Sequence, residues 1–188
     1  MTQNASRDSW TSGQSYERYM GRWSRMIAAK FLGWVDPPSN ADWLEVGCGT
    51  GALTKTILSD ASPRSMLVTD QSDGFVAYAE GENEDERVQF EVADATQLPC
   101  PDASRDIITS ALVLNFVPDR QKAFAEMRRV LRPDGFFAFY VWDYPNGGMG
   151  FIDAFWKAAA EIDARAAELD EGRRFPFCQS DGLQQLCQ

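Results

Sequence analysis

Glycine recurs at every second position in Gly47, Gly49 and Gly51, directly after a short apolar segment. Glycines between a strand and a helix let a ligand approach the backbone and meet the amide groups of a helix N-terminus. With Ala52 the run also fits the dinucleotide pattern G-x-G-x-x-G/A, and Asp70 follows about 20 residues further on. A carboxylate at that point can accept hydrogen bonds from both ribose hydroxyls. These residues predict an adenosine-containing cofactor.

Three other residues narrow the choice of cofactor. Glu45 lies two residues before the first glycine, where its carboxylate would favour a ligand with a cationic amino group or a sulfonium. Asp94 and Ala95 follow another predicted strand. There the carboxylate can accept from an adenine amino group, and the next backbone N–H can serve a ring nitrogen. An NAD-type dehydrogenase would leave Glu45 and the Asp94-Ala95 pair unexplained.

The segments that must position these residues alternate between strand and helix from Asp42 onward. The expected strands are 41–46, 65–70, 88–92, 106–114 and 136–142. The expected helices are 16–35, 52–59, 72–80, 119–131, 151–171 and one that begins near 180. This alternation predicts an α/β, Rossmann-like doubly wound and mostly parallel sheet. In such sheets the ligand lies beyond the carboxyl ends of the strands, which are here Gly47–Gly51, Asp70, Asp94 and 111–115.

The first helix has its apolar residues Trp23, Ile27, Phe31 and Trp34 on one face, and Pro37 follows its end. We expect a mobile tail over 1–15, this helix within 16–38, and one domain over 39–188. The length of 188 residues agrees with one domain rather than two.

Composition excludes several classes of function. The net charge of −10 disfavours a nucleic-acid partner, although residues 1–35 hold five basic and two acidic residues. Those basic residues fit a solvated helix and an anion-contacting arm equally well.

The chain has no histidine, which removes Ser-His-Asp catalysis and most zinc chemistry. Its four cysteines are not spaced as metal ligands, so we expect free thiols and no metal site. No run of about 18 apolar residues and no secretory signal is visible, so we expect no membrane span and a cytoplasmic location.

Taken together, these motifs resemble those of class I S-adenosylmethionine-dependent methyltransferases. The resemblance covers about 40–143 and includes Glu45–Gly51, Asp70, Asp94-Ala95, the loop Leu98–Asp102 and the segment Arg129–Gly135. The segment 16–24 also resembles the N-terminal helix that closes over the cofactor in many members that act on small molecules.

The resemblance implies a role for each matching residue. Gly47, Gly49 and Gly51 would pass close to the methionine part of S-adenosyl-L-methionine, supported by Glu45 and Thr50. Asp70 would hold the ribose. The adenine would lie near Gln71, Asp94 and Ala95, and Ala111 would meet the methionine part through its backbone. Tyr16 and Arg22 are weaker candidates for covering the cofactor and meeting its carboxylate, and helix packing or solvation explains each equally well.

The expected function is methyl transfer to a small-molecule acceptor by in-line displacement. An NAD-type dehydrogenase and a cofactor-binding but inactive module remain as alternatives. Without histidine, the candidates for a base are Asp143, Tyr144 and Tyr16. Asn115 is interpreted only as part of the exit from the fourth strand.

The family's fold normally has seven strands, the last two forming a hairpin. Only 45 residues follow Asp143, and they show helical patterns. We therefore expect a C-terminally truncated domain with five parallel strands in the order 3-2-1-4-5.

Overall fold

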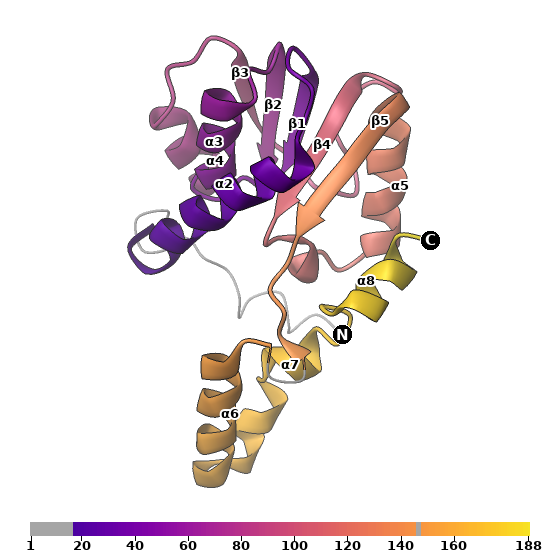
Figure 1. The fold of residues 1–188 in the computed structure, drawn as a ribbon. Coiled ribbons are helices and arrows are strands. Elements are labelled where there is room, and N and C mark those ends of the chain that lie inside the picture. The colour runs from indigo at the N-terminus through magenta and orange to yellow at the C-terminus, as the bar shows by residue number, and fades with distance from the viewer. Residues whose placement is uncertain (1–16, 146–147) are drawn as a thin grey trace. The chain divides into compact units, whose positions relative to one another are not determined.

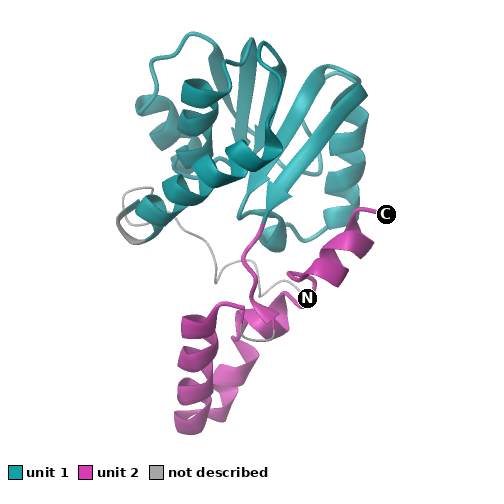
Figure 2. Cartoon of the chain, viewed as in Figure 1, with its two compact units in different colours: residues 1–140 teal, residues 141–188 magenta. Residues whose placement is uncertain are grey.

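The computed structural model of the protein describes residues 17–145 and 148–188. The chain divides into two compact units, residues 1–140 and residues 141–188 (Figure 2). The predicted tail 1–15 and Tyr16 lie outside the described residues.

The first unit is built on a five-stranded sheet (Figure 1). Its strands are β1 (Asp42–Val46), β2 (Ser65–Asp70), β3 (Val88–Val92), β4 (Arg105–Ala111) and β5 (Leu131–Tyr140). All neighbours pair in parallel and the order is β3-β2-β1-β4-β5. The predicted fold class and strand order are therefore confirmed, and the direction of winding reverses next to β1, where such sheets bind their ligands.

Helices connect and cover the strands of this unit. They are η1 (Glu17–Gly21, a π-helix), α2 (Arg22–Val35), α3 (Ala52–Asp60), α4 (Asp73–Gly81), the 3₁₀ turn η2 (Leu114–Phe116) and α5 (Arg120–Val130). Ser72 caps α4, where its Oγ accepts a hydrogen bond from the N–H of Phe75 at 3.4 Å. Asp119 caps α5 in the same way through the N–H of Lys122 at 3.0 Å.

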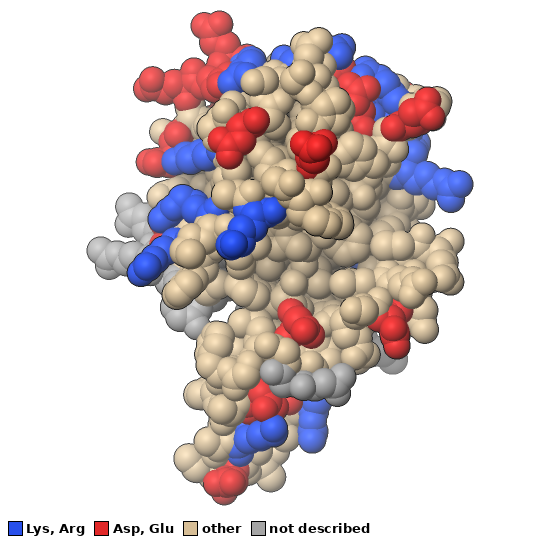
Figure 3. All heavy atoms as spheres, viewed as in Figure 1, with Lys and Arg blue, Asp and Glu red and all other residues tan. Residues whose placement is uncertain are grey.

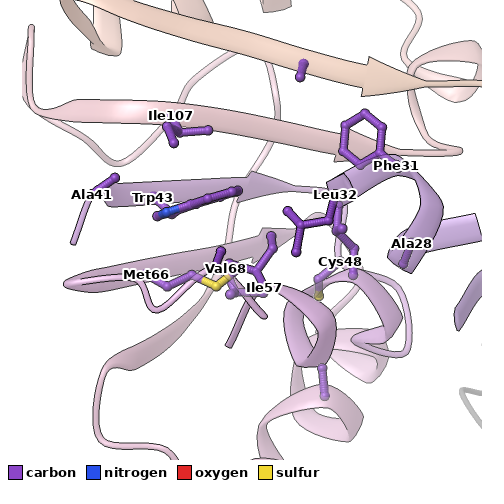
Figure 4. Packing of buried hydrophobic residues seen from close by; sticks show 14 residues of the cluster. Ala28, Phe31, Leu32, Ala41, Trp43, Cys48, Ile57, Met66, Val68 and Ile107 are labelled. Atoms are coloured by element: carbon purple, nitrogen blue, oxygen red, sulfur yellow. The ribbon is translucent and has the colours of Figure 1, made fainter. Parts of the chain in front are cut away.

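The core on one face of the sheet joins the strands to α2 and α3 (Figure 4). Trp43 of β1, flanked in register by Met66 of β2 and Ile107 of β4, is fully buried there. Phe31 of α2 and Ile57 of α3 pack against them. Each such side chain contributes about 1.5–3 kcal/mol on burial, so this cluster holds α2 and β1 at fixed positions relative to each other.

The helix α2 differs from the predicted apolar face. Trp23 and Trp34 are 52% and 77% exposed, and the buried positions are Ser24, Ala28, Phe31 and Leu32. The buried face of α2 is therefore turned relative to the predicted one, and Phe31 is the one buried residue of the four predicted positions.

Three strand ends, one of β4 and both of β5, also differ from the prediction by two residues or more. β4 ends at Ala111 rather than at 114, because Leu112 takes a left-handed φ of 60° and η2 follows. β5 begins at Leu131 and ends at Tyr140, rather than running from 136 to 142. Among the described residues no strand pairs with the other edge of β5.

The second unit consists of short helices in its described residues. They are α6 (Gly150–Ile162), the 3₁₀ helix η4 (Ala164–Glu168), α7 (Glu171–Arg174) and α8 (Ser180–Leu186). The prediction of one helix over 151–171 is wrong. Asp163 has an extended backbone, and its carboxylate accepts from the N–H of Arg165 at 3.0 Å, which ends α6 and starts η4. None of the described helices combines the length and apolarity needed to cross a bilayer.

Candidate functional site

The predicted site residues that follow β1, β2 and β3 are joined by backbone contacts. The N–H groups of Gly47 and Cys48 both donate to the carbonyl of Thr69, at 2.7 and 3.0 Å. The N–H of Ala93 donates to the carbonyl of Asp70 at 2.9 Å. The three strand ends therefore form one continuous edge, and the structure brings together the glycine loop, Asp70 and the segment that leads to Asp94.

The glycine loop 47–51 has positive φ angles at its three glycines, of 81°, 52° and 80°. Its first and second glycines differ in their surroundings. A Cβ at Gly47 would lie 2.4 Å from Cγ2 of Val113, whereas a Cβ at Gly49 would have no atom of the described residues within 4 Å. Gly47 therefore allows the chain after β4 to pack on the loop, and Gly49 presents bare backbone to open space.

Asp70, at the end of β2, holds the glycine loop in place. Its Oδ2 accepts from the N–H of Gly49 at 3.0 Å, and its Oδ1 accepts from the N–H of Ser72 at 2.9 Å. Burial raises the pKa of the Asp70 carboxyl, and these backbone hydrogen bonds offset part of that effect. The side chain thus stands beside the exposed face of Gly49 with a carboxylate that can accept further hydrogen bonds.

Glu45 is fully buried in β1, which is unusual for a carboxyl group. Its Oε2 accepts from the hydroxyl of Thr54 in α3 at 2.7 Å, and its Oε1 has no partner among the described residues. Burial raises the pKa of Glu45 to about 8, and the nearby Asp70 adds to the rise. A buried acceptor without a partner costs stability, so its presence here agrees with a ligand-binding role at the base of the site.

The raised pKa of Glu45 predicts a specific pH dependence of stability. In unfolded chains the group titrates near 4.5, and in the folded protein near 8. Between these values only the folded protein keeps the proton, so the free energy of unfolding falls as pH rises through this window, by about 1.4 kcal/mol per pH unit. Glu45→Gln, which keeps an acceptor for Thr54, should remove this slope. Denaturant titrations of the wild type and of Glu45→Gln at pH 5.5 and 7.5 measure the slope. An equal pH dependence of the two unfolding free energies would contradict the raised pKa of Glu45.

The end of β3 places the predicted adenine-reading pair on the same edge of the sheet. Asp94 is exposed and its Oδ1 accepts from the N–H of Thr96 at 2.7 Å, while Ala95 is buried. Gln71, after β2, is exposed. The loop Leu98–Asp102 is held by Arg129 of α5, whose guanidinium donates to the carbonyls of Leu98 and Cys100. The same guanidinium forms ion pairs with Asp102 and Glu126.

The end of β4 completes this edge. Ala111 is the last residue of β4 and pairs in register with Tyr140. The hydroxyl of Ser110 donates to the carbonyl of Val46 at 2.8 Å, which joins the ends of β4 and β1. Asn115 is almost completely buried, and neither atom of its amide has a hydrogen-bond partner among the described residues. This burial was not predictable from the sequence pattern, which extends the strand to 114 and so misses the turn at Leu112.

The N-terminal helix reaches the glycine loop through a residue that the sequence analysis did not identify. The hydroxyl of Thr50, which is buried in the loop, donates to Oε2 of Glu17 at 3.0 Å. Arg25 of α2 pairs with the other oxygen of Glu17. Arg22, one of the weaker candidates for meeting the cofactor carboxylate, has its guanidinium 5.4 Å from the ring centre of Trp23. Nothing in the sequence spacing links Glu17 to Thr50, since 33 residues separate them.

Asp143 and Tyr144, two candidates for a base, belong to the second unit. Asp143 lines a hollow of about 450 Å³ within that unit, together with Pro145, Cys178 and Ser180. The ring centre of Tyr144 lies 5.7 Å from that of Phe175. The third candidate, Tyr16, lies outside the described residues.

Comparison with known proteins identifies the domain. Residues 44–139 match a family model described as a methyltransferase domain. The malonyl-[acyl-carrier protein] O-methyltransferase of Geobacter sulfurreducens is 31% identical over 154 residues, which cover 80% of this chain and 55% of that protein. The enzyme of the same name from Hahella chejuensis is 35% identical over 94 residues, which cover 50% of this chain and 34% of that protein. The chain thus spans about a third to a half of the length of these relatives.

Solved structures show the same fold. A SAM-dependent methyltransferase from Aquifex aeolicus superposes with a TM-score of 0.62 at 18% identity, over 72% of this chain and 75% of that one. An S-adenosylmethionine-dependent methyltransferase from Mesorhizobium loti gives a TM-score of 0.55 at 24% identity, over 65% and 57% of the two chains.

Proposed function

This chain belongs to the class I S-adenosylmethionine-dependent methyltransferase family, and we propose that it transfers a methyl group from S-adenosyl-L-methionine to a small-molecule acceptor. The observation that supports this most directly is the contact between Gly49 and Asp70. In this contact the carboxylate of Asp70, which would accept from a ribose diol, lies beside the backbone of Gly49, where no atom of the described residues is within 4 Å of an added Cβ.

The residues present fit this cofactor chemically. Glu45 offers a buried oxygen without a partner among the described residues, and an ammonium or sulfonium group beside it would favour the charged form of its carboxyl group. Asp70 would accept from the ribose hydroxyls. Asp94 and Ala95 would meet the adenine edge beside Gln71, and the loop from Gly47 to Gly51 would approach the methionine part together with Thr50 and the backbone of Ala111.

When bound, S-adenosylmethionine supplies a methyl group already activated by its sulfonium, for in-line displacement by the acceptor. The protein then has to align the acceptor and exclude water, which can lower the barrier by several kcal/mol without a catalytic side chain. A base is needed only for an acceptor that must lose a proton. Asp143 and Tyr144 remain the proposed candidates among the described residues.

The proposed acceptor is a small molecule rather than a nucleic acid. Named relatives include a malonyl-[acyl-carrier protein] O-methyltransferase, a demethylmenaquinone methyltransferase and a sterol 24-C-methyltransferase. The net charge of −10 also disfavours binding to a phosphate backbone. Residues 16–38 would cover the cofactor, and residues 39–188 would form the methyltransferase domain.

Methyl transfer from isotope-labelled S-adenosylmethionine to a panel of carboxylic acids, quinols, sterols and amines tests the activity. We expect labelled product with at least one class of acceptor, and at least about tenfold less with Asp70→Ala at a subsaturating cofactor concentration. Tight binding of the cofactor with no product from any acceptor would instead favour an inactive cofactor-binding module.

A further inference from the structure

The outer side of α2 carries a strip of apolar and basic residues that the core does not use. Helix residues three or four positions apart lie on one face, and this spacing joins Trp23, Met26, Lys30 and Trp34. The exposed fractions of the two indoles are 52% and 77%, that of Met26 is 48%, and Lys30 is also exposed. The buried residues of α2 lie on another side of the helix, where it packs against the strands and α3. Packing within the first unit therefore does not explain why three large apolar side chains of one strip are exposed.

The charges on α2 favour an anionic partner for this strip. From Arg22 to Val35 the chain has three basic and no acidic residues, although the whole chain has a net charge of −10. Arg25 forms an ion pair with Glu17, so Arg22 and Lys30 carry the net positive charge of the helix. In the space-filling view, basic side chains gather over α2 (Figure 3). The strip thus lies in a locally positive part of an acidic protein.

Indole rings together with positive charge fit the surface of an anionic bilayer. Trp is enriched at the level of the lipid headgroups, where its ring meets apolar chains and its N–H stays hydrated. A helix in this plane binds through buried apolar area and through attraction between its basic residues and anionic lipids. A protein partner fits less well, because Lys is depleted at the centre of protein interfaces and Lys30 lies between the two indoles. In a bilayer, by contrast, the Lys30 ammonium can reach the headgroups while its methylene chain stays in apolar contact.

We propose that this strip binds the surface of a bilayer that contains anionic lipids, with α2 lying in the plane of the headgroups. Trp23 and Trp34, about 16 Å apart along the helix axis, would enter the headgroup layer near the two ends of the helix. Lys30 would reach the lipid phosphates between them. The contact is peripheral, involves one helix of the first unit, and does not depend on the proposed function.

Sedimentation of the full chain with unilamellar vesicles tests this. Vesicles of phosphatidylcholine alone are compared with vesicles that also contain about 30% phosphatidylglycerol, an anionic lipid. We expect the wild type to bind the anionic vesicles at least about fivefold more tightly, which is the contribution of one basic residue near an anionic surface. Raising the salt concentration to about 0.5 M should remove most of this difference, because the Debye length then falls to about 4 Å.

A charge reversal on the strip tests the contribution of Lys30. Lys30→Glu should weaken binding to the anionic vesicles at least about tenfold, because the strip loses one positive charge and gains a negative one. Lys157→Glu is the matched control. Lys157 is 74% exposed on α6, and its replacement changes the net charge of the chain by the same amount. We expect this control to leave the affinity for the anionic vesicles within about twofold of the wild type.

A second substitution tests the indoles. Trp34→Ser should weaken binding to the anionic vesicles at least about fivefold, because the apolar area that the ring would remove from water is lost. Phe155→Ser is the matched control, since Phe155 is an aromatic residue that is 58% exposed on α6. Thermal unfolding followed by circular dichroism should give the wild-type midpoint for both variants, because exposed positions contribute little to stability. Wild-type affinity of a folded Trp34→Ser protein would contradict the role of the indole.

Four further results would overturn the lipid surface. No sedimentation of the wild type with the anionic vesicles at low salt would leave an acidic protein or a nucleic acid as the partner of the strip. A loss for Lys157→Glu equal to that for Lys30→Glu would show that only the net charge matters. A loss for Phe155→Ser as large as that for Trp34→Ser would place the contact on α6. A dimer in light scattering that Trp34→Ser abolishes, with vesicle binding unchanged, would assign the strip to a second copy of the chain.

Discussion

Replacement of Asp70 by alanine is expected to weaken S-adenosylmethionine binding at least tenfold. In the proposed complex two ribose hydroxyls share this carboxylate, and a hydrogen bond to a charged group is worth about 1.5–3 kcal/mol. The same substitution removes the acceptor for the N–H groups of Gly49 and Ser72. The dissociation constant from calorimetry measures the loss, and the free energy of unfolding shows how much of it comes from a loosened loop.

Two variants separate the charge of Asp70 from its shape and position. Asp70→Asn keeps an oxygen acceptor of similar size and should give a smaller loss than alanine. Asp73→Ala removes an exposed carboxylate from the first turn of α4 and should leave the affinity within twofold of the wild type. An unchanged dissociation constant for a folded Asp70→Ala protein would rule out the ribose assignment.

Gly49→Val is expected to abolish cofactor binding while the domain stays folded. A Cβ at Gly49 would meet no atom within 4 Å in the part of the chain that the structure describes, so the main source of strain is the left-handed φ of 52°. That strain is of the order of 1–2 kcal/mol, which a folded domain can tolerate. The added side chain would fill the space in front of the bare backbone, where we place the methionine part of the cofactor.

Gly47→Ala, in contrast to Gly49→Val, is expected to lower the stability of the domain more than it lowers cofactor binding. Its Cβ would overlap Val113, with Cγ2 at 2.4 Å, so the main loss should be in stability. The double variant Gly47→Ala with Val113→Ala relieves this overlap and should recover part of the lost free energy of unfolding, the φ strain remaining. Circular dichroism with denaturant, run beside the binding assay, measures both quantities. Similar losses of stability for Gly47→Ala and Gly49→Val would show that the loop has been placed wrongly.

The fold was predictable because each of its signals is local. The apolar strands, the helical patterns between them and the glycine loop all act within a few residues, and the strand order follows from the family resemblance. The acidic residues at the strand ends were found for the same reason, since a parallel sheet brings them to one edge. The structure places Glu45, Asp70 and Asp94 on that edge, and their roles towards the cofactor remain proposals.

The features that the sequence did not reveal depend on contacts between distant residues. Val113 packs on Gly47, and Glu17 reaches Thr50 across the N-terminal helix; neither contact leaves a periodic signal in the chain. The turn at Leu112 was missed because an apolar residue with a left-handed backbone conformation looks like strand in the sequence. The break at Asp163 was missed because Ala, Glu and Arg on both sides all favour helix.

We propose that the edge formed by Glu45, Gly49 and Asp70 binds S-adenosylmethionine. Calorimetric titration of the full chain with S-adenosylmethionine, S-adenosylhomocysteine and NAD⁺ at pH 7.5 tests it most directly. We predict saturable 1:1 binding of both S-adenosyl ligands and no heat of binding from NAD⁺ at the same concentration. Saturable binding of NAD⁺ with no binding of either S-adenosyl ligand would contradict the account.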